Sequence, residues 1–230
     1  MSLGLIIPLY DEDALVTEVV ASTHATLEQA DIEHTLVLVN NGSSDQTGRL
    51  IDELAQDASV VSIHLRENAG YGGGIQAGLA WLEQNGMPEV VGWMWGDGQI
   101  SPSTLPPLYA ACISGTPLAK VIRKERQDGI ARHIMTTAYA ATTRAMGIHT
   151  TDVNGCPKLM TREAFKQIQP GSTDWFLDAE VVLAAEERNW DIATHVATMQ
   201  PRKGGKSKVN WRTIAEFAWN LSRWRLGNSK

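Results

Sequence analysis

Three features are scarce in this chain of 230 residues. Its two cysteines, Cys112 and Cys156, are too few for a disulfide framework and do not stand at a metal-ligand spacing. No run of about 18 apolar residues occurs, so the sequence has no ordinary transmembrane helix. Basic residues are outnumbered, with 20 Lys and Arg against 26 Asp and Glu, and a net charge of −6 argues against general nucleic-acid binding. We expect a folded cytoplasmic protein whose membrane contact, if any, is peripheral.

The positive charge that is present gathers at the end of the chain. Residues 201–230 hold eight basic residues and one acid, a net charge of +7, whereas residues 1–200 hold 12 basic and 25 acidic residues, a net charge of −13. Two parts this different predict a tail that meets an anionic partner. We therefore divide the chain into a domain of residues 1–200 and a basic appendage of residues 201–230.

The first 95 residues alternate between short apolar runs and segments with helical spacing. The runs predict strands at 5–9, 35–39, 60–65 and 90–95, and the spacing predicts helices at 14–30, 43–55 and 75–84. This order is typical of βαβ units and a parallel sheet. The less regular second half predicts helices at 105–114, 134–146 and 177–189, and strands at 119–122 and 192–199. The fold class is α/β, with a mostly parallel central sheet flanked by helices.

Polar segments follow three of the predicted strands directly, at residues 10–12, 40–45 and 97–99. Ligands of parallel sheets bind at the carboxyl ends of the strands. We therefore expect these three segments to border one cleft.

Several segments carry distinctive combinations of polar residues and glycine. They are IPLYDE at 7–12, VNNGSSDQT at 39–47, RENAGYGGG at 66–74, MWGDGQISP at 94–102 and PRKGGKSKV at 201–209. In this order they resemble motifs of the family 2 inverting glycosyltransferases of the GT-A fold. They most resemble the branch that moves sugars from nucleotide donors to polyprenyl phosphates, the dolichol-phosphate mannose synthase type. The resemblance runs from residue 5 to about residue 225 and implies a donor of the GDP-mannose or UDP-glucose type.

The resemblance implies that the first two segments hold the nucleoside of the donor. Pro8, Tyr10 and Glu12 match a motif in which tyrosine stacks or hydrogen-bonds and a carboxylate accepts from base or ribose. A solvated acidic turn after a strand is the alternative. Asn40 and Asn41 stand where the family has two acids that read base and ribose, and an amide still offers a donor and an acceptor there.

The next two segments correspond to the diphosphate and its cation. Gly70 and Gly72 belong to a glycine-rich loop that allows close backbone approach to a phosphate at a helix N-terminus. Asp97 and Gln99 keep two oxygen ligands of the family's Asp-Ala-Asp-Gly-Gln motif, which suits Mg²⁺ or Mn²⁺. Trp95 replaces the first acid of that motif, which affects either the metal affinity or the ribose contact. A plain turn after a strand is the alternative.

Basic residues are expected to bind the phosphates of the donor and the acceptor. The resemblance assigns Arg123, Arg126 and Arg132 to the donor diphosphate and the acceptor phosphate, because arginine suits bidentate phosphate recognition. Arg202, Ser207 and Lys208 match a flexible loop of the polyprenyl-phosphate branch that closes over phosphates. A solvated charged loop is the alternative for these three arginines, and a nucleic-acid or nuclear-localisation patch is the alternative for the second group.

Two acids are candidates for work on the sugar or acceptor. Asp152 is expected to hydrogen-bond the sugar or orient the acceptor, and Asp178 stands where relatives with hydroxyl acceptors carry a general base. A phosphate acceptor is already ionised, so Asp178 is expected to position rather than deprotonate. A carboxylate favoured by the helix dipole is its alternative. A transferase acting on a hydroxyl would need Asp178 or Glu180 as base, and a non-catalytic nucleotide-sugar binder is the third hypothesis.

The tail combines an apolar helical side with arginines over residues 211–225. A basic helix with Trp and Phe suits the surface of an anionic membrane. A helix packed on the domain, with arginine stems covering apolar surface, fits the same pattern.

Overall fold

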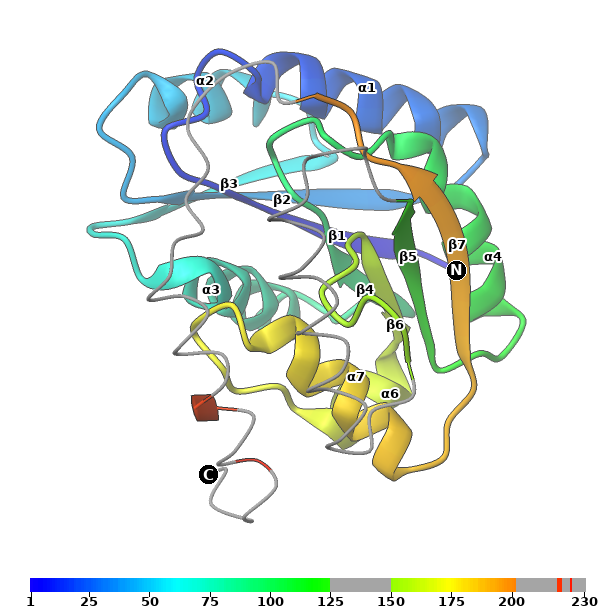
Figure 1. Cartoon of the computed structure of the whole chain (residues 1–230). Helices are drawn as coiled ribbons and strands as arrows, with labels where there is room; N and C mark the ends of the chain where they lie inside the picture. The colour runs from blue at the N-terminus through cyan, green and yellow to red at the C-terminus, as the bar shows by residue number, and fades with distance from the viewer. Residues whose placement is uncertain (125–149, 202–218, 221–223, 225–230) are drawn as a thin grey trace.

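The computed structural model describes residues 1–124, 150–201, 219, 220 and 224. These residues form a seven-stranded sheet with helices on both faces (Figure 1). The strands are β1 (Leu3–Leu9), β2 (His34–Asn41), β3 (Val60–Leu65), β4 (Val90–Trp93), β5 (Leu118–Lys124), β6 (Lys158–Thr161) and β7 (Ile192–Thr198). The helices are α1 (Val16–Gln29), α2 (Thr47–Leu54), α3 (Gly70–Gln84), α4 (Leu105–Ile113), α6 (Arg162–Ile168) and α7 (Leu177–Glu187), with a short 3₁₀ helix at Pro102–Thr104.

The sheet has the strand order β3-β2-β1-β4-β6-β5-β7. The pairs β1–β2, β1–β4, β2–β3 and β5–β7 are parallel, and β6 runs antiparallel to both of its neighbours. The predicted α/β class with a mostly parallel sheet is confirmed. Within the described part of the chain, no helix has the length and apolar content needed to cross a membrane.

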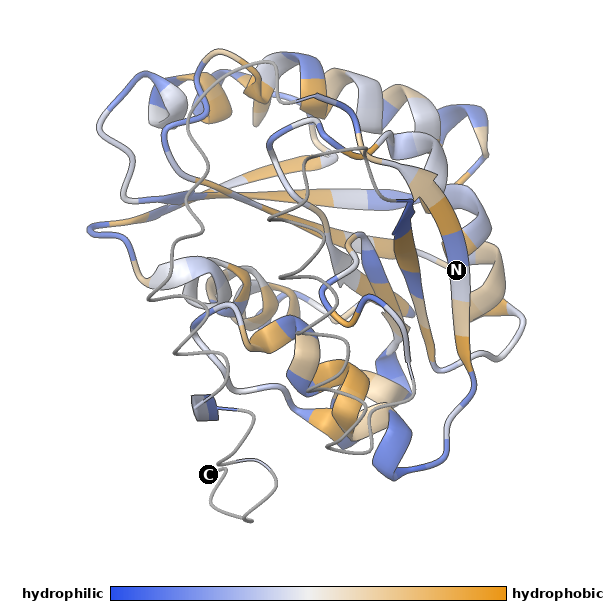
Figure 2. Cartoon of the chain, in the orientation of Figure 1, coloured by the Kyte–Doolittle hydropathy of each residue, from blue (hydrophilic) through white to orange (hydrophobic). Residues whose placement is uncertain are grey.

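Alternation along the strands builds a core on each face of the sheet. In β1, Leu5 and Ile7 join a cluster with α1, α2 and α4, whereas Ile6 joins a cluster with α3, α6 and α7. Because both faces are covered, the central strands are apolar almost without interruption. Figure 2 shows this as hydrophobic colour along the central strands and over most of α7.

The element boundaries differ from the predicted ones at places that bear on the site. Strand β4 ends at Trp93 rather than at residue 95, and α3 begins at Gly70 rather than at residue 75. Strand β6 and helix α6 were not predicted at all, since four and seven residues are too short for a clear period. The predicted helix at 134–146 lies outside the described residues.

Candidate active site

The carboxyl ends of β1, β2 and β4 lie at one edge of the sheet. The parallel register pairs Leu9 with Asn40 and Ile6 with Trp93, so the segments after these strands emerge side by side. The structure thereby brings together residues 10–12, 40–45 and 97–99, as the sequence analysis expected.

The loops that follow β1 and β2 are fastened to each other. Asp11, which has a left-handed φ of 51°, donates its N–H to Ser43 Oγ (3.0 Å) and accepts from the N–H of Ser44 (2.8 Å). One residue later, the N–H of Glu12 donates to Thr47 Oγ1 at 2.9 Å. Glu12 is buried, Tyr10 is half-buried, and Pro8 lies within β1. Their predicted contacts with a nucleoside stay predictions.

Asp45 stands two residues before the start of α2. Its carboxylate accepts from the N–H of Thr47 (2.9 Å) and from the N–H of Asp13 (3.1 Å). Burial opposes ionisation, but these hydrogen bonds outweigh it and lower the pKa of Asp45. The acid therefore holds the helix start and the β1 loop together.

Asn40 and Asn41 use their amide groups within the protein. Asn40 Oδ1 accepts from the N–H of Ser43 at 2.9 Å, and both asparagines are buried. Asn41 Nδ2 donates to the carbonyl of Gly70 at 2.8 Å, and its Oδ1 accepts from the N–H of Ala69 at 2.9 Å. The two amides shape the loops at this edge of the sheet, and reading a base or ribose stays a prediction for them.

The glycines at the start of α3 make room for protein backbone. A Cβ atom on Gly72 would lie 2.5 Å from the carbonyl oxygen of Ser172, and one on Gly70 would lie 2.6 Å from that of Thr173. The N–H of Gly73 donates to the Thr173 carbonyl at 2.8 Å. The helix N-terminus therefore has a partner in the segment after α6. This is a different reason for the glycines from the predicted phosphate approach, which has no direct support here.

The turn after β4 carries the predicted metal ligands. Asp97 Oδ1 accepts from the N–H of Gln99 at 3.1 Å, around Gly98 with its positive φ of 66°. Gln99 is joined to Gln200, since its Nε2 donates to the Gln200 carbonyl (3.1 Å) and its own carbonyl accepts from the Gln200 N–H (2.7 Å). The turn is thus attached to the residue that precedes the basic segment 201–209.

The oxygen atoms of this turn suit a cation shared with a diphosphate. Asp97 offers a carboxylate and Gln99 an amide oxygen, and Mg²⁺ is commonly held by one or two carboxylates together with substrate phosphates. Across residues 1–124 and 150–201, no three His, Cys, Asp or Glu side chains gather into a metal site. Among the residues of these ranges, Asp97 and Gln99 are therefore the candidate ligands, and a bound substrate and water would add further oxygen atoms.

Trp95 lies between a tyrosine and an arginine. Its indole N–H donates to Tyr71 Oη at 3.1 Å, and the Tyr71 ring stacks on Trp175 with centroids 4.3 Å apart and planes 6° apart. On Trp95 itself lies the guanidinium of Arg123, 5.2 Å from the ring centroid, a cation–π contact.

Asp152 is clamped by Arg123. Its carboxylate accepts from Arg123 Nε (3.0 Å) and Nη2 (2.5 Å), and also from the Arg123 backbone N–H (2.8 Å). Burial opposes ionisation of Asp152, yet the contact with Arg123 prevails and lowers its pKa. Asp152 therefore stays ionised beside Trp95, and a sugar contact remains a prediction for it.

Asp178 lies inside the protein, at the start of α7. Its Oδ1 is 2.8 Å from Lys158 Nζ and accepts from the indole N–H of Trp93 at 3.0 Å. Lys158 is 0% exposed and Asp178 is 1% exposed. The pair joins β4, β6 and α7. The sequence analysis missed Lys158, although a lysine inside the apolar run Pro157-Lys158-Leu159-Met160 was a signal for a buried ion pair.

A second buried lysine supports the turn that carries Asp152. Lys120 in β5 donates to the carbonyl oxygens of Thr151 (2.8 Å) and Asp152 (2.7 Å) and is 0% exposed. Burial, followed by the charge of Lys158, lowers the pKa of Lys120 to about 7. The Lys120 amine is therefore about half protonated near pH 7.

Lys120 predicts a dependence of stability on pH. In the unfolded chain its pKa returns to the ordinary value of 10.5, so above pH 7 the unfolded state binds more protons than the folded state. The free energy of unfolding is therefore expected to rise by about 2 kcal/mol from pH 7 to pH 9. Urea titrations of the wild type, Lys120→Met and the exposed control Lys166→Met measure it. The rise should disappear only in Lys120→Met, and an unchanged rise there contradicts the assignment.

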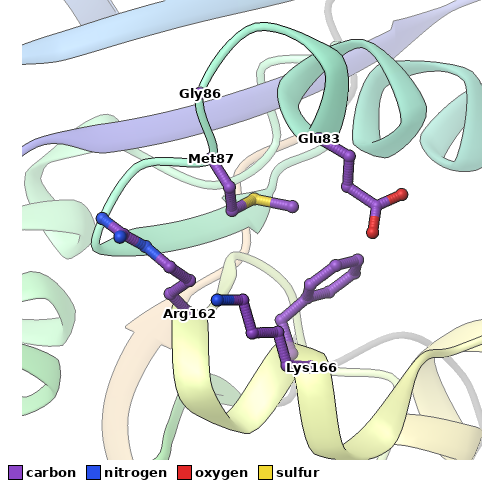
Figure 3. Close-up of a pocket in the computed structure, with 6 residues that line it drawn as sticks. Glu83, Gly86, Met87, Arg162 and Lys166 are labelled. Carbon is purple, nitrogen blue, oxygen red and sulfur yellow. The ribbon is translucent and has the colours of Figure 1, made fainter.

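Two cavities lie outside this cleft edge. One of about 440 Å³ lies between the end of α3 and helix α6, and Figure 3 shows Met87 facing Arg162 and Lys166 across it. The other, of about 660 Å³, lies between α1 and the turn after β4, and Met94, Gly98 and Gln200 are among its lining residues. The second cavity therefore borders the Asp97 turn from the side of α1.

Several predicted phosphate-binding residues lie outside the described residues, namely Arg126, Arg132, Arg202, Ser207 and Lys208. Most of the tail, residues 202–218, 221–223 and 225–230, does so as well. In the part that is described, Trp224 Nε1 donates to Glu187 Oε1 at 2.8 Å, whereas Trp219 is 67% exposed. Both hypotheses for the tail, packing on the domain and a surface role, stay open.

Comparison with known proteins identifies a family and several similar proteins. The model of "Glycosyl transferase family 2" matches residues 5–169. Undecaprenyl-phosphate 4-deoxy-4-formamido-L-arabinose transferase of Proteus mirabilis is 29% identical over 151 residues, which are 63% of this chain and 45% of the relative. The enzyme of that name from Edwardsiella ictaluri is 30% identical over 127 residues, 54% of this chain and 38% of the relative. The aligned part of this chain thus spans less than half the length of these relatives.

Solved structures share the fold at low sequence identity. Glucosyl-3-phosphoglycerate synthase from Mycobacterium tuberculosis, in complex with Mg²⁺ and uridine diphosphate, has a TM-score of 0.70 and 18% identity over 100% of this chain and 80% of its own. Its complex with Mn²⁺, uridine diphosphate and phosphoglyceric acid has a TM-score of 0.68 and 18% identity, with the same coverage. The predicted GT-A fold is confirmed by this likeness. With a family model over most of its length and the family's motifs along one edge of its sheet, the chain belongs to glycosyl transferase family 2.

Proposed function

We propose that the protein transfers a sugar, with inversion, from a nucleotide-sugar donor to a polyprenyl phosphate. The observation that carries the proposal is the attachment of the Asp97 turn to Gln200 through two hydrogen bonds. It connects the candidate site of the leaving diphosphate with the start of the basic segment 201–209. The names of the curated relatives, undecaprenyl-phosphate sugar transferases, support this choice of acceptor class.

The chemistry required of the protein is mostly positioning of two anions. An oxygen of the acceptor phosphate forms a bond to the anomeric carbon while the bond from that carbon to the donor diphosphate breaks. The acceptor oxygen is already ionised, so no proton has to be removed. A Mg²⁺ or Mn²⁺ ion held by Asp97 and Gln99 would neutralise charge on the leaving diphosphate. The basic residues of segments 126–132 and 202–208 would neutralise the rest.

The geometry disfavours a hydroxyl acceptor, which would require a general base. Asp178 is buried against Lys158 and Trp93. Glu180, the other candidate base, accepts from the N–H groups of Gly171 (3.0 Å) and Ser172 (2.9 Å). Both carboxylates hold protein structure, which supports an acceptor that needs no deprotonation.

A transfer assay tests the proposal. The purified chain is incubated with Mg²⁺ or Mn²⁺, a panel of nucleotide sugars that includes GDP-mannose and UDP-glucose, and a short polyprenyl phosphate. Nucleoside diphosphate release and sugar extracted into organic solvent are followed together. We expect organic-soluble sugar from one donor. Nucleotide-sugar binding without a lipid product, with either metal, contradicts the proposed acceptor and favours a hydroxyl acceptor or a binding protein.

The tail gives the assay a second arm. We propose that residues 211–225 bring the protein to an anionic membrane surface, where a polyprenyl phosphate resides. Deletion of residues 211–230 should then reduce transfer to acceptor in anionic vesicles and leave transfer to a short, detergent-dispersed acceptor intact. Equal activity of the deletion variant in both formats would remove the tail from the proposal.

A further inference from the structure

His64 in strand β3 is a polar side chain to which the sequence analysis assigned no role. Parallel pairing places His64 beside Asn40 of β2, so the two side chains lie on the same face of the sheet. The ring of His64 has a neighbour at each nitrogen. Its Nε2 lies 2.8 Å from Asp52 Oδ1 of helix α2, and its Nδ1 lies 3.3 Å from Asn40 Nδ2. His64 therefore connects β3 with both the neighbouring strand and the helix that covers it.

The contacts of Asn40 determine which way its amide group faces. The backbone N–H of Ser43 can only donate, so the amide atom that it meets at 2.9 Å is Oδ1. The NH₂ group of Asn40 therefore faces His64, and the ring nitrogen opposite it must accept. Asn40 is 8% exposed, so this NH₂ group would be a buried donor without that acceptor. Gly48 leaves room for the arrangement, since a Cβ atom there would lie 2.8 Å from Asn40 Nδ2.

The same contacts select one tautomer of His64. Because Nδ1 accepts from Asn40, it carries no proton, and Nε2 carries the proton that is donated to Asp52. Ser62 Oγ donates to the same Asp52 oxygen at 2.8 Å and so helps to orient the carboxylate. A ring with protons on both nitrogens would place two donors against each other at Asn40. The geometry thus fits a neutral His64 with its proton on Nε2.

Asn40 transmits this constraint to the loops that follow β1 and β2. Ser43, which donates its N–H to Asn40, also accepts from the N–H of Asp11 through Oγ at 3.0 Å. Asp11 in turn accepts from the N–H of Ser44 at 2.8 Å. The two loops are therefore fastened to each other next to the residue that Asn40 holds. A continuous series of hydrogen bonds leads from Asp52 through His64 to this edge of the sheet.

We propose that His64 is a positioning residue of the donor site. In its neutral form, oriented by Asp52, it holds Asn40 and thereby the conformation of residues 10–12 and 40–45. The inference rests on the proposed function, because it assigns these two loops to a nucleotide donor. What the site requires is an acceptor atom at the position of Nδ1, and a side chain other than histidine that supplies one should preserve the loops and the donor affinity.

The test compares two replacements of His64 in the full chain. His64→Asn places an amide oxygen near the position of Nδ1, whereas His64→Leu has a similar volume and no acceptor. Calorimetry measures the dissociation constants of uridine diphosphate and guanosine diphosphate, each with Mg²⁺. For the nucleotide that the wild type binds, His64→Leu should weaken affinity at least about fivefold and His64→Asn less than about twofold. The control His195→Leu, in strand β7 at the other side of the sheet, should bind like the wild type.

Two nuclear magnetic resonance measurements give a readout that needs no nucleotide. Two-bond ¹H–¹⁵N spectra at about pH 7.5 should show His64 of the wild type with its proton on Nε2. Asn40→Asp sets a carboxylate against Nδ1 and should give a ring with protons on both nitrogens. Solvent exchange of the Ser43 N–H should be at least about tenfold faster in His64→Leu than in the wild type, and unchanged in His64→Asn.

Three outcomes overturn the role of His64. They are a wild-type ring with its proton on Nδ1, a His64→Leu variant with wild-type exchange and affinity, and equal losses in His64→Asn and His64→Leu. The last would indicate that the ring acts by packing rather than by accepting a hydrogen bond. Failure of both nucleotides to bind the wild type contradicts the proposed function instead, and the exchange of the Ser43 N–H then decides whether His64 holds the loops.

Discussion

Replacing Lys158 with methionine is expected to lower the free energy of unfolding by about 3–5 kcal/mol. The variant leaves the carboxylate of Asp178 buried, at 1% exposed, and without its ion pair, while Oδ1 keeps the hydrogen bond from the Trp93 indole N–H. An unpaired buried charge is one of the few causes of so large a loss. Guanidinium denaturation of Lys158→Met measures it.

Two further variants test whether that loss of stability comes from the unpaired buried charge of Asp178. Arg162→Met breaks the half-exposed pair with Glu89 (3.0 Å) and should cost less than about 1 kcal/mol. The double variant Lys158→Met with Asp178→Leu removes both charges and should recover most of the stability. If the double variant folds and retains at least a tenth of the transfer rate, Asp178 has a structural role. If Lys158→Met is as stable as the wild type, the ion pair contributes nothing.

Replacing Asp97 with asparagine is expected to reduce sugar transfer by about 100-fold or more without changing stability. The amide oxygen of asparagine still accepts from the N–H of Gln99, so the turn is preserved. Only the negative charge is lost, and with it the charged ligand for the cation on the leaving diphosphate. Initial rates of organic-soluble product and a thermal melt measure the two properties.

The matched control for this variant is Asp31→Asn. Asp31 has a left-handed φ of 53°, which asparagine also adopts readily, and it precedes β2 at the edge of the sheet opposite the cleft. It should keep the wild-type rate and melting temperature. Retained transfer in Asp97→Asn would exclude Asp97 from the reaction and leave the cation without its proposed ligand.

The parts of the fold that could be predicted are those with local signals. Apolar runs and polar ends identified β1 to β4 and the edge at which residues 10–12, 40–45 and 97–99 meet. Strand β6 was missed because it has only four residues and begins with Lys158, whose buried partner Asp178 is 20 residues away. Local periodicity carries no information about such a partner.

The candidate site shows the same division. The motif positions were visible, but the uses of their side chains depend on distant contacts. Arg123 was assigned to phosphates with its neighbours, whereas the structure joins it to Asp152, 29 residues on, and to Trp95. The glycines of α3 were assigned to a phosphate, whereas the backbone near Thr173 fills the space beside them. A glycine in a sequence indicates that another group approaches the backbone closely, but it does not identify that group.

The two hydrogen bonds between Gln99 and Gln200 limit how far the basic residues after Gln200 can lie from the Asp97 turn. They fix the position at which the basic segment begins, because that segment starts at the residue after Gln200. A chain spans at most about 3.6 Å per residue, so the Cα atom of Arg202 lies within about 7 Å of that of Gln200, and that of Lys208 within about 29 Å. Each residue inserted after Gln200 would raise the limit for Arg202 by a larger fraction than the limit for Lys208.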